Sequence, residues 1–287
     1  MTKVEVRDLD APYGAEVLGW DPATPTDEAT AQLLRRTYDE RGLLLLRELD
    51  LTFEAQQGLA DLLVGAEQVS MAAEGATSTG NLVSNQNEST SAVGVLSFHA
   101  DAMWSDDPFK LVSLYALEVA PDAAPTTFAS TENAWRTLPH DLRERVDGLR
   151  VVHGEGQYIP PDSNVLYASN PAQADRSTIT PIGWTHPTTG RTLLFVSEQQ
   201  TRAVLELPRD ESQALLAELF AHLYDPANVY EHHWRDGDLA IWDNLAVQHG
   251  RPHVDWDSPA RTLRRAVYPP PWLWSVVYDI RPAAAGG

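Results

Sequence analysis

Cysteine is absent from the 287 residues of the chain. This absence excludes a disulfide framework and any thiolate metal ligand. Long apolar runs are also missing, since none approaches the roughly 18 residues that a membrane-spanning helix needs. The first six residues lack the apolar core of a signal peptide. We therefore expect a cytoplasmic protein that does not cross a membrane.

Positive charge is scarce, because 21 Lys and Arg face 41 Asp and Glu and leave a formal net charge of −20. A negative field disfavours binding to nucleic acid or to an anionic membrane. It still permits a small anionic substrate, since a local pair of arginines overrides the global field. We expect a small molecule as the binding partner, and the chain can form a homo-oligomer.

The composition is that of a globular protein, with 43% hydrophobic residues and nine Trp. Short strands separated by turns dominate, while amphipathic helices are expected near residues 27–41, 53–64, 131–138, 141–146 and 210–224. This pattern favours a mixed α/β fold with a mainly β core, in the form of a double-stranded β-helix (a distorted jelly roll) flanked by helices. No repeat or linker divides the sequence, so a single domain over residues 1–287 is predicted.

Two long polar segments interrupt the predicted strands, at residues 67–95 and 155–180. Loops of this length in a compact chain are usually functional or disordered. The first leads directly into an apolar stretch that contains His99. We therefore interpret residues 70–95 and 155–180 as candidate lids over a site.

The stretch Ser97-Phe98-His99-Ala100-Asp101 sets a histidine and an aspartate two residues apart. On a strand, residues i and i+2 point to the same face, so both side chains would project together. A second histidine from elsewhere would complete two His and one carboxylate, which is the ligand set of non-haem Fe(II) oxygenases.

His249 is the strongest candidate for the third ligand. It closes a predicted strand–turn–strand segment that begins at Ile241, and Arg261, Arg264 and Arg265 follow on a further strand. A buried arginine on a strand requires an anionic partner, which a dicarboxylate cosubstrate would supply, with Thr126 adding a hydroxyl. The other histidines are interpreted as structural or surface residues: His140, His153, His186, His222, His232, His233 and His253.

The ordered set of these segments resembles the taurine dioxygenase family of Fe(II)- and 2-oxoglutarate-dependent oxygenases, which includes herbicide-degrading members. The family pattern is His-x-Asp, about two dozen residues, Thr or Ser, a long gap, His, ten to thirteen residues and Arg. Here 24 residues separate Asp101 from Thr126, 122 separate Thr126 from His249, and 11 separate His249 from Arg261. Gly14 to Val17 and the turn from His186 to Arg191 are also similar, so the likeness covers nearly the whole chain.

The resemblance implies that His99, Asp101 and His249 bind Fe(II), with dioxygen as a cosubstrate. It implies that Thr126 and Arg261 hold the distal carboxylate of 2-oxoglutarate. Arg265 matches a position that reaches an anionic substrate group. The sequence departs from the family in having Ala123-Ala124-Pro125 before the threonine, and in having no histidine before residue 98 that could bind a sulfonate. Taurine itself is therefore disfavoured as the substrate.

The implied reaction is hydroxylation of an unactivated C–H bond, with release of succinate and carbon dioxide. Asp101 favours this outcome, because a small residue there would leave room for a halide. Desaturation or another oxidation in natural-product biosynthesis is an alternative, and a Zn-dependent hydrolase or a non-catalytic cupin-like binding protein ranks lower.

Several neighbours of the predicted metal ligands have two readings. Trp104 is interpreted equally as a substrate-binding wall and as core packing. Met71, Asn85 and Asn87 are interpreted mainly as structural residues. Trp242 and Asn244 are expected to orient His249.

Overall fold

The computed structural model describes residues 3–65, 82–86, 93–154 and 177–269, in a mixed α/β fold dominated by β-sheets. Five α-helices occur in this part of the chain: α1 (Glu28–Arg41), α2 (Phe53–Val64), α3 (Thr131–Thr137), α4 (His140–Val146) and α5 (Arg209–Leu223). None of these helices is long and apolar enough to cross a membrane.

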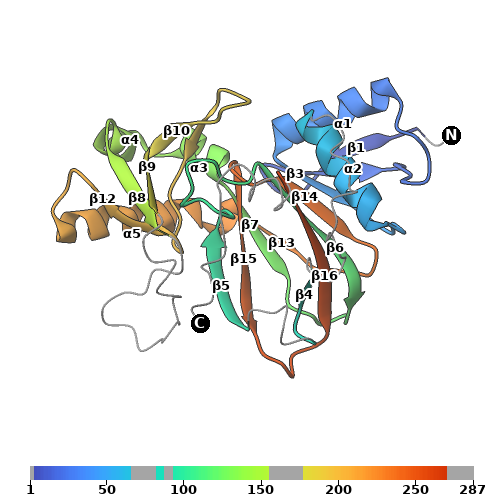
Figure 1. Ribbon diagram of the computed structural model, residues 1–287. Coiled ribbons are helices and arrows are strands. Elements are labelled where there is room, and N and C mark those ends of the chain that lie inside the picture. The colour runs from blue at the N-terminus through green and yellow to red at the C-terminus, as the bar shows by residue number, and fades with distance from the viewer. Residues whose placement is uncertain (1–2, 66–81, 87–92, 155–176, 270–287) are drawn as a thin grey trace, which may run out of the picture.

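Two larger sheets form the centre of the molecule (Figure 1). The seven-stranded sheet has the order β1 (Glu5–Asp8), β2 (Ala15–Leu18), β3 (Leu43–Leu46), β14 (Leu239–Asp243), β6 (Leu111–Val119), β16 (Arg261–Tyr268) and β4 (Leu82–Ser84). The four-stranded sheet has the order β13 (Val229–His232), β7 (Thr126–Ser130), β15 (Val247–Val254) and β5 (Gly94–His99).

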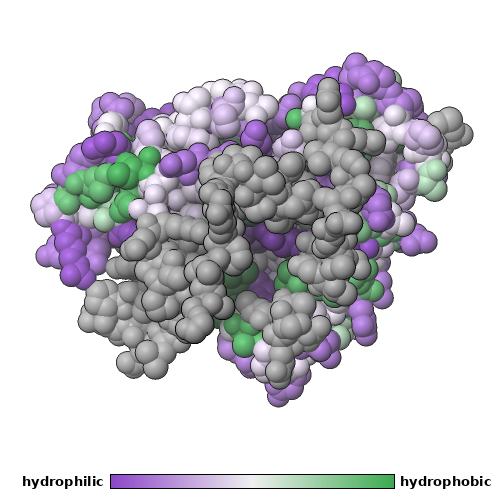
Figure 2. All heavy atoms as spheres, in the orientation of Figure 1, coloured by the Kyte–Doolittle hydropathy of each residue, from purple (hydrophilic) through white to green (hydrophobic). Residues whose placement is uncertain are grey.

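Two smaller sheets lie with α3, α4 and α5 at the other end of the molecule from α1 and α2 (Figure 1). One has the order β12 (Thr201–Val204), β8 (Arg150–Gly154) and β9 (Ser177–Pro181), and the other pairs β10 (Gly183–Thr185) with β11 (Thr192–Leu194). Figure 2 shows apolar atoms on the side of β8, β9 and β12 and again in the lower middle of this face, with hydrophilic residues between and around them.

Strand β3 shows how the sequence pattern builds two cores. Leu43 and Leu45 pack into the apolar cluster that also contains Trp242 and Phe128. Leu44 and Leu46 point the other way, into the cluster shared with α1 and α2. Because successive side chains on a strand alternate between faces, a continuous run of four leucines marks a strand that is buried on both sides.

The first helix begins and ends as its sequence predicts. The Asp27 carboxylate caps α1 by accepting a hydrogen bond from the Thr30 amide. Gly42 ends the helix with φ of 70°, a left-handed conformation that glycine adopts without steric cost. Helix α1 also forms the crossover that lets β2 and β3 pair in parallel.

The structure corrects the predicted loops in part. Residues 82–84 form β4, and residues 94 and 95 begin β5, although the sequence analysis placed all of them in a lid candidate. Residues 177–180 belong to β9 and likewise are not loop. Short strands show little hydrophobic periodicity in the sequence. Whether such a segment forms a strand depends on its pairing with neighbouring strands. Residues 85, 86 and 93 are described outside strands. The remaining residues of both lid candidates, together with Met71 and Asn87, lie outside the described residues.

Candidate functional site

Strands β5 and β15 place two histidines side by side. They pair in antiparallel fashion, and His99 and His249 are direct cross-strand partners. The side chains of such partners lie on the same face of the sheet, and here the ring centroids are 4.1 Å apart. Sheet register therefore joins two histidines that are distant in the sequence.

Asp101 reaches the same point by a turn, not by a strand. Strand β5 ends at His99, and Ala102 has φ of 58°, so the prediction that His99 and Asp101 share a strand face was wrong. Asn244 holds the turn, because its side-chain oxygen accepts a hydrogen bond from the Asp101 amide at 2.8 Å and its amide group donates to the Asp101 carbonyl at 2.9 Å. The buried Asn244 thus fixes the backbone that carries the carboxylate.

The three side chains present one ligand atom each to a common point. Oδ1 of Asp101 lies 3.4 Å from Nε2 of His99 and 4.0 Å from Nε2 of His249. All three ligand atoms lie within 4.8 Å of one another. Nδ1 of His99 is 2.9 Å from the Ser97 carbonyl oxygen, so Nδ1 carries the proton and donates, which leaves the lone pair of Nε2 for a metal ion.

The charges at this point are those that a divalent cation requires. Burial would by itself raise the pKa of Asp101, but the Arg265 guanidinium and the two histidines hold this pKa well below its usual range. Burial lowers the pKa of His249 to about 3, and the neighbouring His99 adds to this effect. An ionised carboxylate and neutral imidazoles are the protonation states in which these groups bind metals.

A second polar group lies beside the three ligands. Arg261, at the start of β16, is only 4% exposed, and its Nη2 donates a hydrogen bond to the Thr126 hydroxyl at 2.8 Å. Its Nε donates to the Ala124 carbonyl at 3.1 Å. Burial lowers the pKa of Arg261 to about 9, and the charge of Arg251 contributes. The guanidinium remains charged at neutral pH, and the two oxygens that accept these hydrogen bonds are neutral.

A cavity of about 220 Å³ connects the two groups. His99, Asp101, His249, Thr126 and Arg261 all line it, so the structure brings together every predicted metal and cosubstrate residue. The remaining lining residues are mostly apolar: Val83, Leu96, Val112, Leu114, Trp242, Gly250, Arg251 and Arg265.

The two predicted substrate residues take different places. Arg265 lines the cavity but binds Oδ2 of Asp101, with its Nε at 3.2 Å and a second hydrogen bond from Nη2. Trp104 is half-buried and packs against the central core cluster, and it is not among the residues that line the cavity. This contact supports core packing for Trp104, and its binding of substrate stays a prediction.

Other neighbours hold the site from outside. The Trp242 ring packs against the His249 ring, with centroids 4.8 Å apart, and its role in orienting His249 stays a prediction. Asn244 binds the backbone of Asp101. Asn85 is structural as predicted: its side-chain oxygen accepts from the Arg261 amide at 2.9 Å, and its amide group donates to three carbonyls of the β15–β16 turn.

The remaining histidines lie away from the three ligands, as expected. His153 is buried between the Thr201 and Thr180 hydroxyls, at 3.1 and 2.9 Å. His186 pairs with Asp243 at 2.9 Å, and His232 with Asp238 at 3.3 Å. His140, His233 and His253 are exposed. His222 is half-buried, and its Nε2 lies 2.9 Å from the Ala134 carbonyl oxygen.

Trp234 was not singled out from the sequence, yet it contacts the predicted cosubstrate residues. Its indole Nε1 donates a hydrogen bond to the Thr126 hydroxyl at 3.0 Å, and its ring lies 6.0 Å from the Arg261 guanidinium carbon. The only signal in the sequence is its place just after strand β13, whose pairing with β7 is a tertiary property.

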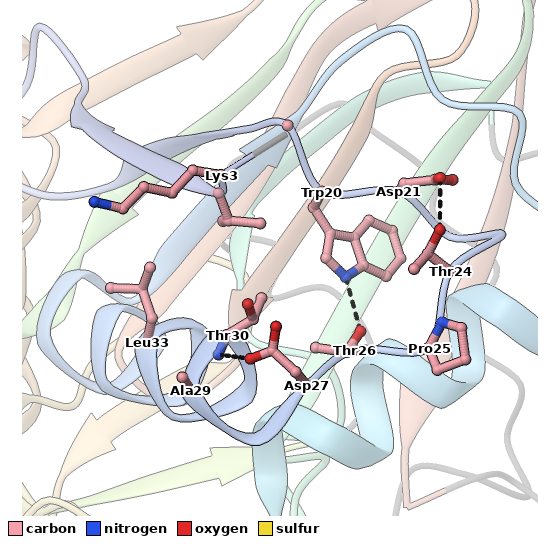
Figure 3. A pocket seen from close by; sticks show the side chains of 12 residues that line it. Lys3, Trp20, Asp21, Thr24, Pro25, Thr26, Asp27, Ala29, Thr30 and Leu33 are labelled. Atoms are coloured by element: carbon pink, nitrogen blue, oxygen red, sulfur yellow. Dashed lines mark hydrogen bonds between the residues drawn. The ribbon is translucent and has the colours of Figure 1, made fainter. Parts of the chain in front are cut away.

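A larger hollow of about 570 Å³ lies elsewhere, beside the start of α1 (Figure 3). Several of its polar side chains have partners within the same segment. Trp20 donates to the Thr26 hydroxyl at 3.1 Å, Thr24 donates to Asp21 at 2.9 Å, and Asp27 caps the helix. This hollow therefore does not offer the convergent groups that line the cavity around His99.

Comparisons with known proteins agree with this geometry. Residues 5–267 match the model of the family described as "Taurine catabolism dioxygenase TauD, TfdA family". The chain is 34% identical over 173 residues to the alpha-ketoglutarate-dependent 2,4-dichlorophenoxyacetate dioxygenase of Cupriavidus pinatubonensis, a match that covers 59% of this chain and 58% of that protein. The match thus spans less than two thirds of that relative's length.

Longer matches exist at lower identity. Pentalenolactone F synthase of Streptomyces avermitilis is 25% identical over 284 residues, which cover 88% of this chain and 90% of that protein. A crystal structure of a taurine dioxygenase from Burkholderia xenovorans superposes with a TM-score of 0.69 at 25% identity, over 92% of this chain and 90% of that chain. AAD-2, crystallised with Mn(II) and N-oxalylglycine, has a TM-score of 0.75 at 24% identity, over 93% and 97% of the two chains, and shows the shared fold.

The family match covers nearly the whole chain and includes every residue of the cavity. The resemblance predicted from the His-x-Asp, Thr, His and Arg positions is confirmed at the level of the family. On this evidence the chain belongs to the taurine catabolism dioxygenase TauD, TfdA family.

Proposed function

We propose that this protein is an Fe(II)- and 2-oxoglutarate-dependent dioxygenase that hydroxylates a C–H bond of a small organic molecule. The observation that carries the proposal is one cavity in which a two-His, one-Asp ligand set lies beside the buried, charged Arg261. Two imidazoles and a carboxylate on one side of a metal ion are the ligand set of non-haem iron oxygenases.

The donor set fits a divalent ion. His99 and His249 each offer an imidazole nitrogen, and Asp101 offers Oδ1 while Arg265 binds its other oxygen. The ion together with 2-oxoglutarate and dioxygen would supply the oxidation of a substrate C–H bond, with succinate and carbon dioxide as coproducts. The chain's own residues bind and orient these partners.

Arg261 and Thr126 would hold the distal carboxylate of 2-oxoglutarate. A guanidinium and a hydroxyl at 2.8 Å from each other offer parallel donors to the two oxygens of one carboxylate. A hydrolytic zinc enzyme would have no need of this pair, so the pair favours the oxygenase over the hydrolase. The intact set of three candidate metal ligands favours an enzyme over a non-catalytic binding protein.

The architecture of the core and the role of Arg265 belong to the same proposal. The facing seven-stranded and four-stranded sheets support a double-stranded β-helix core and a single domain. The position of Arg265 supports a role in orienting Asp101, and its contact with substrate stays a prediction. The cytoplasmic location and the capacity for a homo-oligomer also stay predictions.

The test uses the purified protein with Fe(II) and 2-oxoglutarate in the absence of oxygen. We expect a weak visible absorption band, and succinate formation once air and a substrate panel are added. His249→Ala should abolish the band, whereas His253→Ala, on the same strand but exposed, should keep it. If the unaltered protein shows neither the band nor succinate formation, the proposal that it is an oxygenase is wrong.

A further inference from the structure

The Thr126 hydroxyl accepts two hydrogen bonds at once. Trp234 donates from Nε1 at 3.0 Å, and Arg261 donates from Nη2 at 2.8 Å. Indole and guanidinium groups donate only, so neither bond can be reversed. A hydroxyl has two acceptor lone pairs and one proton, and both lone pairs of Thr126 are therefore occupied.

The proton of this hydroxyl is available for donation into the cavity. Among the described residues, no hydrogen bond has the Thr126 hydroxyl as its donor. Thr126 is 2% exposed and lines the cavity beside Arg261. A buried hydroxyl proton without an acceptor costs free energy, so it is directed to whatever ligand atom enters the cavity.

We infer that Trp234 is a positioning residue that sets the Thr126 hydroxyl as a donor and so restricts this end of the cavity to a ligand group that only accepts hydrogen bonds. A carboxylate is such a group, whereas a carboxamide presents N–H donors as well. The inference rests on the proposed binding of 2-oxoglutarate and adds the residue that fixes the polarity of its subsite.

Trp234 is itself held firmly enough for this role. It is 4% exposed and belongs to the central core cluster. The His232 ring meets it edge-on, with ring centroids 4.4 Å apart. The ring also lies 6.0 Å from the Arg261 guanidinium carbon, a distance at which a cation attracts an indole face. Trp234 therefore contacts both donors of the subsite.

The test compares two ligands in one protein. Binding of 2-oxoglutarate and of its distal carboxamide, 2-oxoglutaramate, is measured by calorimetry on the anaerobic Fe(II) protein. In Trp234→Phe the indole N–H is lost, one lone pair of Thr126 becomes free, and the hydroxyl can accept from the amide. We expect the preference for the acid over the amide to fall by roughly 5-fold or more, the effect of one net hydrogen bond.

The chain provides a matched control. Trp20 also donates from its indole nitrogen to a threonine hydroxyl, Thr26, at 3.1 Å, but in the hollow beside α1 (Figure 3). Trp20→Phe removes the same type of bond and should leave the acid-to-amide preference unchanged. A purely structural role of Trp234 would weaken both ligands equally and leave the ratio intact.

The outcomes separate the two proposals. If the unaltered protein does not bind 2-oxoglutarate, the proposed function fails. If it does bind and Trp234→Phe keeps the ratio of the unaltered protein, the role of Trp234 is wrong. Should Trp234→Phe not fold, replacement of Trp234 by the isostere 3-benzothienylalanine removes the N–H and keeps the ring, and the same ratio decides.

Discussion

Arg265 and Asp101 form a half-buried ion pair at the wall of the cavity. Nε of Arg265 lies 3.2 Å from Oδ2 of Asp101, and Nη2 donates a second hydrogen bond to the same oxygen. Oδ1 is left facing the two imidazoles, 3.4 and 4.0 Å from their Nε2 atoms. The two oxygens of this carboxylate therefore have different partners, and the arginine decides which of them faces the metal ligands.

Removing this pair should weaken metal binding. Arg265→Gln keeps a polar side chain but loses the charge and one of the two donors to Oδ2. Partners that orient a metal ligand typically contribute roughly 10- to 100-fold in affinity, and we expect a loss in that range. Titration of the metal-free protein with Mn(II) or Co(II) measures it.

Arg145→Gln is the control, because Arg145 pairs with Glu218 on the exposed faces of α4 and α5. That variant should bind metal like the unaltered protein. If Arg265→Gln keeps its metal affinity and changes only the substrate requirement, Arg265 binds substrate and does not orient Asp101.

Arg261→Ala should raise the requirement for 2-oxoglutarate strongly. A buried, charged contact to one carboxylate is typically worth about 2–5 kcal/mol, or more than ~20-fold in affinity. Binding of 2-oxoglutarate to the anaerobic Fe(II) protein measures this loss. Arg150→Ala, at an exposed pair with Glu206, should have no effect. If Arg261→Ala and the unaltered protein bind 2-oxoglutarate with equal affinity, Arg261 does not bind the cosubstrate.

Asn244→Ala should loosen the turn that carries Asp101. The Asn244 side chain bonds the Asp101 amide, the Asp101 carbonyl and the Phe109 carbonyl, at 2.8, 2.9 and 2.7 Å. Each buried backbone group left without a partner costs about 1–3 kcal/mol. We expect lower stability in urea and weaker metal binding in the protein that remains folded.

The comparison for this variant is Asn228→Ala. Asn228 is also buried and donates to the Ser130 and Leu223 carbonyls, away from the metal ligands. It should lower stability without changing the metal affinity of the folded protein. A similar loss of metal affinity in both variants would reduce the role of Asn244 to general stability.

His153 should make stability depend on pH. Burial lowers its pKa from 6.5 to about 3, and the charge of Arg202 adds to this effect. The pKa is lower in the folded state, so the contribution of the neutral imidazole is complete above pH 6.5 and is lost as the pH falls toward 3. The free energy of unfolding attributable to this group should fall by about 1.4 kcal/mol per pH unit in that window.

Urea unfolding of the metal-free protein at pH 7, 6 and 5 measures the slope. His153→Gln cannot titrate and should show a shallower decline than the unaltered protein. His140→Gln, at an exposed histidine of α4, should retain the original slope. Identical slopes in His153→Gln and the unaltered protein would contradict the assignment.

Local sequence patterns predicted most of the elements that frame the site. The helices predicted near residues 27–41, 53–64 and 210–224 are α1, α2 and α5. Local patterns do not predict strand β12 (Thr201–Val204), and the predicted lid candidates include β4 and most of β9. These short strands depend on hydrogen bonds to partners elsewhere in the chain, which periodicity cannot reveal.

The sequence by itself determined the chemical identity of the site. The order and spacing of four residues indicate the family: His99, Asp101, His249 and Arg261. The capacity to bind a metal ion or a carboxylate depends on the side-chain type, which the sequence states directly. The sequence also excludes thiolate ligands, because the chain has no cysteine.

Only the tertiary structure decided how these groups are held. The pairing of β5 with β15 places His99 beside His249. Asp101 lies in a turn held by the Asn244 side chain, not in the predicted strand. Arg265 binds one oxygen of the Asp101 carboxylate. Trp234 gained a role through its hydrogen bond to Thr126. Hydrogen-bond direction and cross-strand register depend on residues far apart in the sequence, so they exist only once the sheets have paired.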